Sequence, residues 1–130
     1  MGTTSAIGKE NPDGTITAIY CNYDGYPKGV GVILRDYYTD PAKIDAMMDQ
    51  GDMSTIGRNI GIAHSFEERT INECTFYRRD RGERAASLNS QVCPTLNAFA
   101  EHEYNYVFTL EGKWEGYQCN LKSLGDPASW

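Results

Sequence analysis

Alternating hydrophobic and polar positions predict a β-hairpin near the start of the chain. The segments Thr3–Glu10 and Thr15–Asn22 flank the turn sequence Asn11–Gly14. In this turn, Pro12 presets the backbone angle φ and Gly14 accepts a positive φ. The second segment is rich in β-branched residues and alternates as a half-buried strand does. We therefore expect two antiparallel strands joined by a tight turn.

A first helix is predicted directly after this hairpin. Pro27 suits the first turn of a helix, where its missing N–H is no loss. Apolar side chains then recur at helical spacing and mark one buried stripe, formed by Val30, Ile33, Leu34 and Tyr37. Glycines within the first turn are poor helix formers, so we expect another group to approach this backbone closely.

A second helix is predicted from its end signals. Asp40 is the expected N-cap, Pro41 occupies the first turn, and Gly51 lies where a helix-ending glycine belongs. Its inner face is expected to consist of Ile44, Met47 and Met48.

The rest of the chain predicts a mixture of short elements. In chain order these are a helical turn at Asp52–Gly57, an irregular connection at Arg58–Glu73, a strand at Cys74–Arg78, a short helix at Thr95–Glu103, and strands at Tyr104–Leu110 and Lys113–Gln118. Together they predict one α+β domain over residues 1–130. We expect an antiparallel sheet of about five strands, with the helices inserted after the first hairpin and packed on one face.

Composition and charge argue against several classes of protein. Of the 130 residues, 40% are hydrophobic, which suffices for a core. No run approaches the about 18 apolar residues of a membrane span, and the N-terminus lacks the pattern of a secretory signal, so we expect a cytoplasmic protein. Twelve basic against eighteen acidic residues give a net charge of −6. This balance argues against direct DNA binding as the main activity.

The four cysteines predict neither a metal site nor a cofactor. They form no C-x-x-C pair, and only two histidines accompany them, so a zinc site is not expected. Without a sign of export, the thiols are expected to be reduced and mostly buried.

The first candidate site is the glycine loop, defined as Cys21–Gly31. This loop connects the end of a predicted strand to the start of a predicted helix. Free backbone N–H groups and the positive end of the helix dipole can hold an anion there. Its glycine spacing matches neither the phosphate-binding loop nor the dinucleotide fingerprint. The alternative is a tight connection whose glycines relieve crowding. The candidate binding residues are Tyr23, Asp24, Tyr26, Lys28, Gly29 and Gly31.

The second candidate site is the arginine segment, defined as Arg78–Arg84. Four arginines and two acidic residues give it a net charge of +2. Guanidinium groups bind phosphate and carboxylate in a bidentate manner. Either the segment binds a phosphate, a nucleotide or an acidic partner, or its acids neutralise the arginines in an internal network. The candidate binding residues are Arg78, Arg79, Arg81 and Arg84.

Both segments resemble a signature of small phage, prophage and plasmid proteins. The relatives carry roughly C-H-W-D-G-Y-P-x-G-V-G, which Cys21–Gly31 resembles, and an R-D-R-G-E box, which Arg79–Glu83 resembles. The His-Trp of that motif is Asn22-Tyr23 in this chain. A catalytic histidine would therefore be missing here, which favours binding over catalysis.

The resemblance implies an accessory protein of a phage or mobile element, of the anti-defence kind. Examples are an anti-CRISPR protein or one that sequesters an immune signal. The implied partner is a host defence protein or a phosphate-bearing small molecule, with a homo-oligomer as a further possibility. For a nucleotide, we expect the arginines to hold phosphate while Tyr23 or Tyr26 stacks on the base. This requires the two segments to meet in one hollow.

Two alternatives stay open at this point. One is a small hydrolase-like enzyme that uses Cys21 as nucleophile or Asp24 as metal ligand. A buried strand cysteine and a solvated acid explain the same two residues. The other is a component of phage assembly or regulation.

Overall fold

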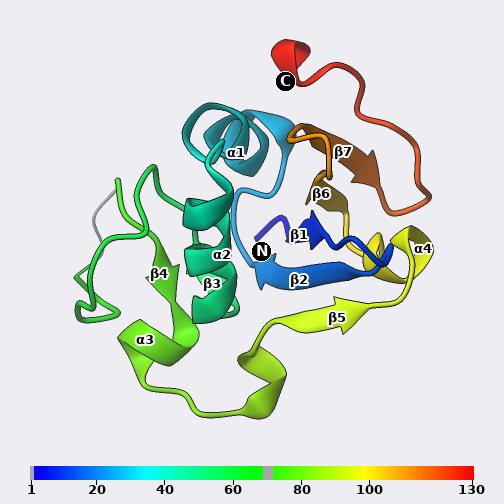
Figure 1. The fold of residues 1–130 in the computed structure, drawn as a ribbon. Helices are drawn as coiled ribbons and strands as arrows, with labels where there is room; N and C mark the ends of the chain where they lie inside the picture. Colours follow the sequence, from blue (N-terminus) through cyan, green and yellow to red (C-terminus); the bar gives the residue numbers. More distant parts are fainter. Residues whose placement is uncertain (1, 69–71) are drawn as a thin grey trace.

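One sheet organises the fold in the computed structural model, which describes residues 2–68 and 72–130 (Figure 1). Within these residues its main path runs β4-β3-β2-β1-β6-β7, and β5 also pairs with β2. The strands are β1 (Ser5–Glu10), β2 (Ile16–Cys21), β3 (Met53–Thr55), β4 (Thr75–Phe76), β5 (Gln91–Cys93), β6 (Tyr104–Phe108) and β7 (Trp114–Gln118).

The predicted hairpin is confirmed. Strands β1 and β2 are antiparallel and pair Ser5 with Cys21 at one end and Glu10 with Ile16 at the other. In the turn, Gly14 adopts a φ of +88° and its N–H donates to the Asn11 carbonyl at 2.9 Å. The turn residues therefore act as their sequence indicates.

The α+β class is confirmed, but the sheet is larger than expected and it is mixed. Two pairings, β1 with β6 and β2 with β3, are parallel, and the others are antiparallel. A parallel neighbour requires a crossover connection, which helices between β2 and β3 supply. The expected purely antiparallel sheet of about five strands is wrong in this respect.

The helices inserted after the first hairpin lie where they were predicted. They are η1 (Pro27–Gly31), α1 (Val32–Tyr37) and α2 (Pro41–Gln50). Val30 and Leu34 are buried as expected, but Tyr37 is 40% exposed and Tyr38 is buried in its place. Tyr38 is the C-cap of α1, where the backbone leaves helical geometry with a φ of −121° and a ψ of 63°, so the buried stripe changes at the end of the helix.

The end signals of α2 are confirmed. The Asp40 carboxylate accepts the N–H of Ala42 at 3.0 Å, and Gly51 ends the helix with a φ of +81°. The buried face of the helix consists of Ile44, Met47 and Met48. None of the helices in the described residues is long and apolar enough to cross a membrane.

The helices inserted after the first hairpin pack on one face of the sheet, as expected, but a further short helix covers part of the opposite face. The larger core lies against α1 and α2 and includes Ile7 and Ile19. A second core on the opposite face includes Ala6, Val107 and Phe99 of α4 (Leu96–Phe99). The strands alternate between two apolar faces, and each face needs a cover.

Two local predictions fail near the candidate site. Asp52–Gly57 was expected to form a helical turn, but Met53 pairs with Cys21 and Phe76 in β3. The predicted strand Cys74–Arg78 ends at Phe76, where α3 (Tyr77–Arg81) begins. After α3 come η2 (Ala86–Leu88) and, near the C-terminus, η3 (Pro127–Ser129).

Candidate functional site

A surface hollow of about 440 Å³ lies beside α3. Its walls come from the end of α2, from α3, from the loop that follows α3 and from the residue after η2 (Figure 1). The lining residues are Gln50, Arg78, Arg79, Gly82, Glu83, Arg84 and Asn89. This volume is within the usual range for small-molecule sites.

The Asp80 carboxylate of α3, whose side chain is fully buried, accepts hydrogen bonds from several segments around the helix. It accepts the backbone N–H of Phe76 at 2.8 Å and that of His64 at 3.1 Å. It also accepts Nε of Arg79 at 2.9 Å and Nη2 at 3.2 Å. Burial acts to raise the pKa of Asp80, but these hydrogen bonds outweigh it and hold the pKa below its usual value. Asp80 therefore stays ionised and positions α3.

The contacts of Arg79 favour the alternative of an internal network over its interpretation as a binding residue. Beyond Asp80, its guanidinium donates to the carbonyls of Ile60, Gly61 and Cys74 at 3.0–3.1 Å. It also lies 4.8 Å from the ring centre of Phe76. These partners use its donors and Asp80 neutralises its charge, so Arg79 has few hydrogen bonds left for a ligand.

Arg81 is also engaged, outside the lining of the hollow. Its guanidinium pairs with the carboxylate of Glu83. It lies 4.6 Å from the ring centre of Tyr77 and 4.8 Å from that of Phe66. The alternative of an internal charge network therefore holds for Arg79 and Arg81.

Arg78 and Arg84 keep donors for a ligand. Nη1 of Arg78 donates to the Asp49 carbonyl at 3.2 Å, at the end of α2, and the rest of that guanidinium has no hydrogen-bond partner among residues 2–68 and 72–130. Arg84 is exposed, and within residues 2–68 and 72–130 it has no hydrogen-bond or ion-pair partner. Two of the four predicted arginines therefore form the accessible cationic part of the hollow.

The glycine loop uses several of its backbone donors within the fold. The N–H of Gly25 donates to the Thr3 carbonyl at 2.9 Å, and the N–H of Val30 donates to the Asp24 carbonyl at 2.8 Å. The N–H of Gly29 donates to Tyr26 within the loop. These donors are used internally, so the anion-binding interpretation of the loop loses its main support.

Close packing explains Gly29 and Gly31. A Cβ at Gly29 would lie 2.2 Å from the Asp24 carbonyl oxygen. A Cβ at Gly31 would lie 3.0 Å from the indole ring of Trp130, which is buried. This supports the alternative of a tight strand-to-helix connection.

The polar residues of the glycine loop are exposed but lie at a different hollow. Tyr23 and Tyr26 are 46% and 40% exposed, and the Tyr26 hydroxyl donates to Asp24 at 3.0 Å. A hollow of about 380 Å³ is lined by Tyr26, Pro27, Lys28, Leu124, Ser129 and Trp130. It shares no lining residue with the hollow beside α3. The expected single hollow, with a tyrosine stacked on a ligand held by arginines, is therefore wrong.

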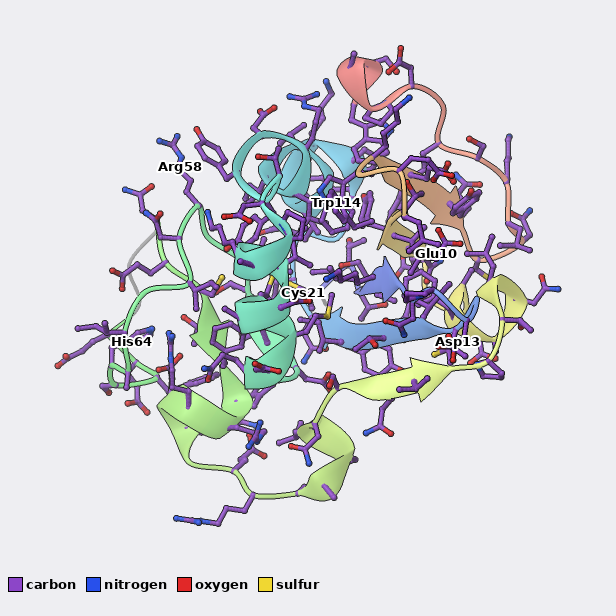
Figure 2. The ribbon with its side chains drawn as sticks, in the orientation of Figure 1. Glu10, Asp13, Cys21, Arg58, His64 and Trp114 are labelled. Carbon is purple, nitrogen blue, oxygen red and sulfur yellow. The ribbon has the colours of Figure 1, made fainter. Side chains whose placement is uncertain are left out.

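Cys21 is not placed to act as a nucleophile. Its side chain is fully buried between the sheet and α2, and Figure 2 shows it far inside the outline of the molecule, while His64 lies at the edge. Burial raises the pKa of its thiol to about 12, so the thiol stays protonated near neutral pH. In the described residues no three histidine, cysteine or acidic side chains form a group that could hold a metal ion.

Sequence reasoning missed three residues around the hollow: Gln50, Asp52 and Asn89. The Asp52 N–H donates to the Leu88 carbonyl at 2.8 Å, which joins the end of α2 to η2. Gln50 and Asn89 flank this contact and line the hollow. No local motif marks them, because their role depends on which segments meet.

Asp52 is expected to make stability depend on pH. Burial raises the pKa of its carboxyl to about 6, while the N–H of Tyr20 donates to it at 3.0 Å. Because the folded-state pKa lies above the unfolded one, this group stabilises the fold below about pH 4 and loses that contribution as pH rises through about 6. Asp52→Asn keeps an acceptor for Tyr20 and should stabilise the protein at pH 8 by about 1–2 kcal/mol.

Thermal unfolding between pH 5 and 8 measures this effect. The variant should gain stability over the parent as pH rises, whereas Asp49→Asn, an exposed control, should change stability little at any pH. A constant difference between parent and Asp52→Asn would contradict the prediction.

Comparison of the chain with protein-family models, with curated proteins and with solved structures finds no match in any of the three. The site is therefore assigned from the geometry and chemistry of its own residues.

Proposed function

We propose that this chain is a non-enzymatic binding protein whose ligand carries a phosphate group. The hollow beside α3 is the binding site, and Arg78 and Arg84 contact the phosphate. The observation that carries this proposal is the accessible guanidinium of Arg84, which has no hydrogen-bond or ion-pair partner among the described residues and lines a hollow of small-molecule size. Guanidinium forks match phosphate oxygens in geometry and charge.

The chemistry of the lining supports binding over catalysis. The residues that could act as nucleophile or metal ligand in the alternative, Cys21 and Asp24, are not part of it. Cys21 is buried, and Asp24 accepts a hydrogen bond from Tyr26 on the surface of the glycine loop. Glu83 is the one acidic residue in the lining, and it is paired with Arg81.

The resemblance to small phage, prophage and plasmid proteins supports an anti-defence role in the host cytoplasm. Such a protein acts by sequestering a phosphate-bearing immune signal or by binding a host defence protein, as an anti-CRISPR protein does. The arginine-lined hollow favours the phosphate-bearing small molecule. Affinity capture on the Arg78→Gln/Arg84→Gln double variant and on the parent separates the two: a host protein retained equally by both would contradict a role through this hollow.

Isothermal titration with inorganic phosphate tests the binding site. Arg84→Gln should weaken phosphate binding about tenfold or more, because it removes a charged hydrogen-bond donor. The double variant with Arg78→Gln should abolish detectable binding.

Arg58→Gln is the matched control. Arg58 is exposed, and its replacement by glutamine removes the same charge as Arg84→Gln. It lies beside Tyr37, away from α3 (Figure 2). It should leave phosphate affinity nearly unchanged. Equal weakening by Arg58→Gln and Arg84→Gln would show a non-specific charge effect and refute the site.

A further inference from the structure

We infer that the hollow beside α3 takes a phosphate monoester of a hydroxyl-rich compound, that is, a sugar monophosphate. This inference rests on the proposed function and names the class of ligand for the same site. Three features of the lining carry it: its uncompensated charge, two carboxamide side chains with open hydrogen-bonding groups, and the absence of aromatic rings from the lining.

The charge of the hollow matches a phosphate monoester. Arg79 is neutralised by the buried Asp80, and Glu83 by Arg81. Arg78 and Arg84 then leave an uncompensated charge of +2 in the lining. A phosphate monoester carries about −1.5 to −2 near neutral pH. A nucleoside triphosphate carries more negative charge than these two arginines balance.

Two carboxamides supply the groups that recognise hydroxyls. Gln50 ends α2 and Asn89 follows η2, and the hydrogen bond from Asp52 to Leu88 holds these two segments together. Neither side-chain amide has a hydrogen-bond partner within residues 2–68 and 72–130. Each amide offers an acceptor and two donors to a ligand.

The arginines stand next to these amides. Arg78 donates to the carbonyl of Asp49, the residue before Gln50, so the cationic group and the first carboxamide share one wall. A ligand with a phosphate on Arg78 and Arg84 therefore presents its neighbouring carbon skeleton to Gln50. Hydroxyl groups on that skeleton satisfy the amides, whereas a hydrocarbon would leave them unpaired at a cost.

The lining offers no ring on which a nucleobase can stack. The seven lining residues include no aromatic side chain. The rings of Phe66 and Tyr77 near α3 are covered by Arg81, and Tyr26 lines the other hollow. Stacking supplies much of the affinity in base recognition. A base on the ligand therefore adds little here, and sugar hydroxyls add more.

Isothermal titration with ribose 5-phosphate, inorganic phosphate and adenosine 5′-monophosphate tests this inference. Ribose 5-phosphate should bind about tenfold more tightly than phosphate, because two additional hydrogen bonds form. Adenosine 5′-monophosphate should bind no more tightly than ribose 5-phosphate. A tighter adenosine 5′-monophosphate complex would overturn the inference and leave the proposed phosphate site intact.

The double variant Gln50→Ala/Asn89→Ala locates the effect. It should lose the tenfold advantage of ribose 5-phosphate over phosphate, while Asn97→Ala, which removes an exposed carboxamide from α4, should keep it. Far-UV circular dichroism verifies folding, and the single variant Asn89→Ala, at an exposed position, should lose part of the advantage by itself.

The remaining outcomes separate the two proposals. Equal affinities of the parent for phosphate and ribose 5-phosphate, or an advantage that survives in the double variant, would overturn the sugar-phosphate inference alone. Absence of any phosphate binding would overturn the proposed function and the inference with it.

Discussion

Replacement of Asp80 by asparagine is expected to lower the free energy of unfolding by about 3–5 kcal/mol. The carboxylate is fully buried and neutralises Arg79, whose side chain is 11% exposed. An amide at this position leaves a buried guanidinium without its counter-ion. It also presents an NH₂ group where two carboxylate oxygens now accept the N–H groups of Phe76 and His64. Since domains of this size are stable by only about 5–15 kcal/mol, the loss is large.

Arg35 and Asp36 provide a matched control for this experiment. They are also consecutive in the chain and paired through Nε of the arginine, at 2.8 Å compared with 2.9 Å for Arg79 and Asp80. Asp36 is 49% exposed, however. Asp36→Asn should therefore cost less than about 1 kcal/mol. Urea unfolding compares the two variants with the parent, and losses of similar size would show that burial of Asp80 is not the cause.

Replacement of Gly29 by alanine is expected to destabilise the fold by about 3 kcal/mol. The added Cβ would meet the backbone carbonyl of Asp24 at 2.2 Å, and backbone cannot move aside as a flexible side chain does. That carbonyl accepts the N–H of Val30, so relief of the clash also disturbs a hydrogen bond at the start of η1.

Lys28, the exposed residue before Gly29, supplies the control for this loss of stability. Lys28→Ala removes a larger and charged side chain from the same turn, yet it should change the free energy of unfolding by about 0.5 kcal/mol or less. If Gly29 instead served ligand binding, Gly29→Ala would leave thermal stability unchanged and reduce phosphate affinity. Thermal unfolding and titration on the same variant distinguish these roles.

The arginine segment shows how far the candidate site could be predicted. Its four arginines are equivalent in the sequence, and both the ligand-binding and the internal-network interpretations fit it. In the fold, Arg79 meets the buried Asp80 and three backbone carbonyls, while Arg84 meets no partner in the described parts of the chain. Each interpretation therefore applies to different residues, and the partners that the fold brings to each guanidinium decide which one applies.

The hairpin turn, the ends of α2 and the α+β class were determined by the sequence alone. Pro12, Gly14, Asp40 and Gly51 act on backbone atoms within a few residues of themselves, so their effects can be predicted from local order.

Only the tertiary structure decided the parallel pairings, the second covered face of the sheet, and the separation of the glycine loop from the arginine segment. It also brought Gln50 and Asn89 to the wall that Arg78 and Arg84 share. The physical reason is the range of the interactions. Strand pairing, burial and ion pairing depend on which distant segments come within hydrogen-bond distance, and spacing along the chain does not encode that proximity.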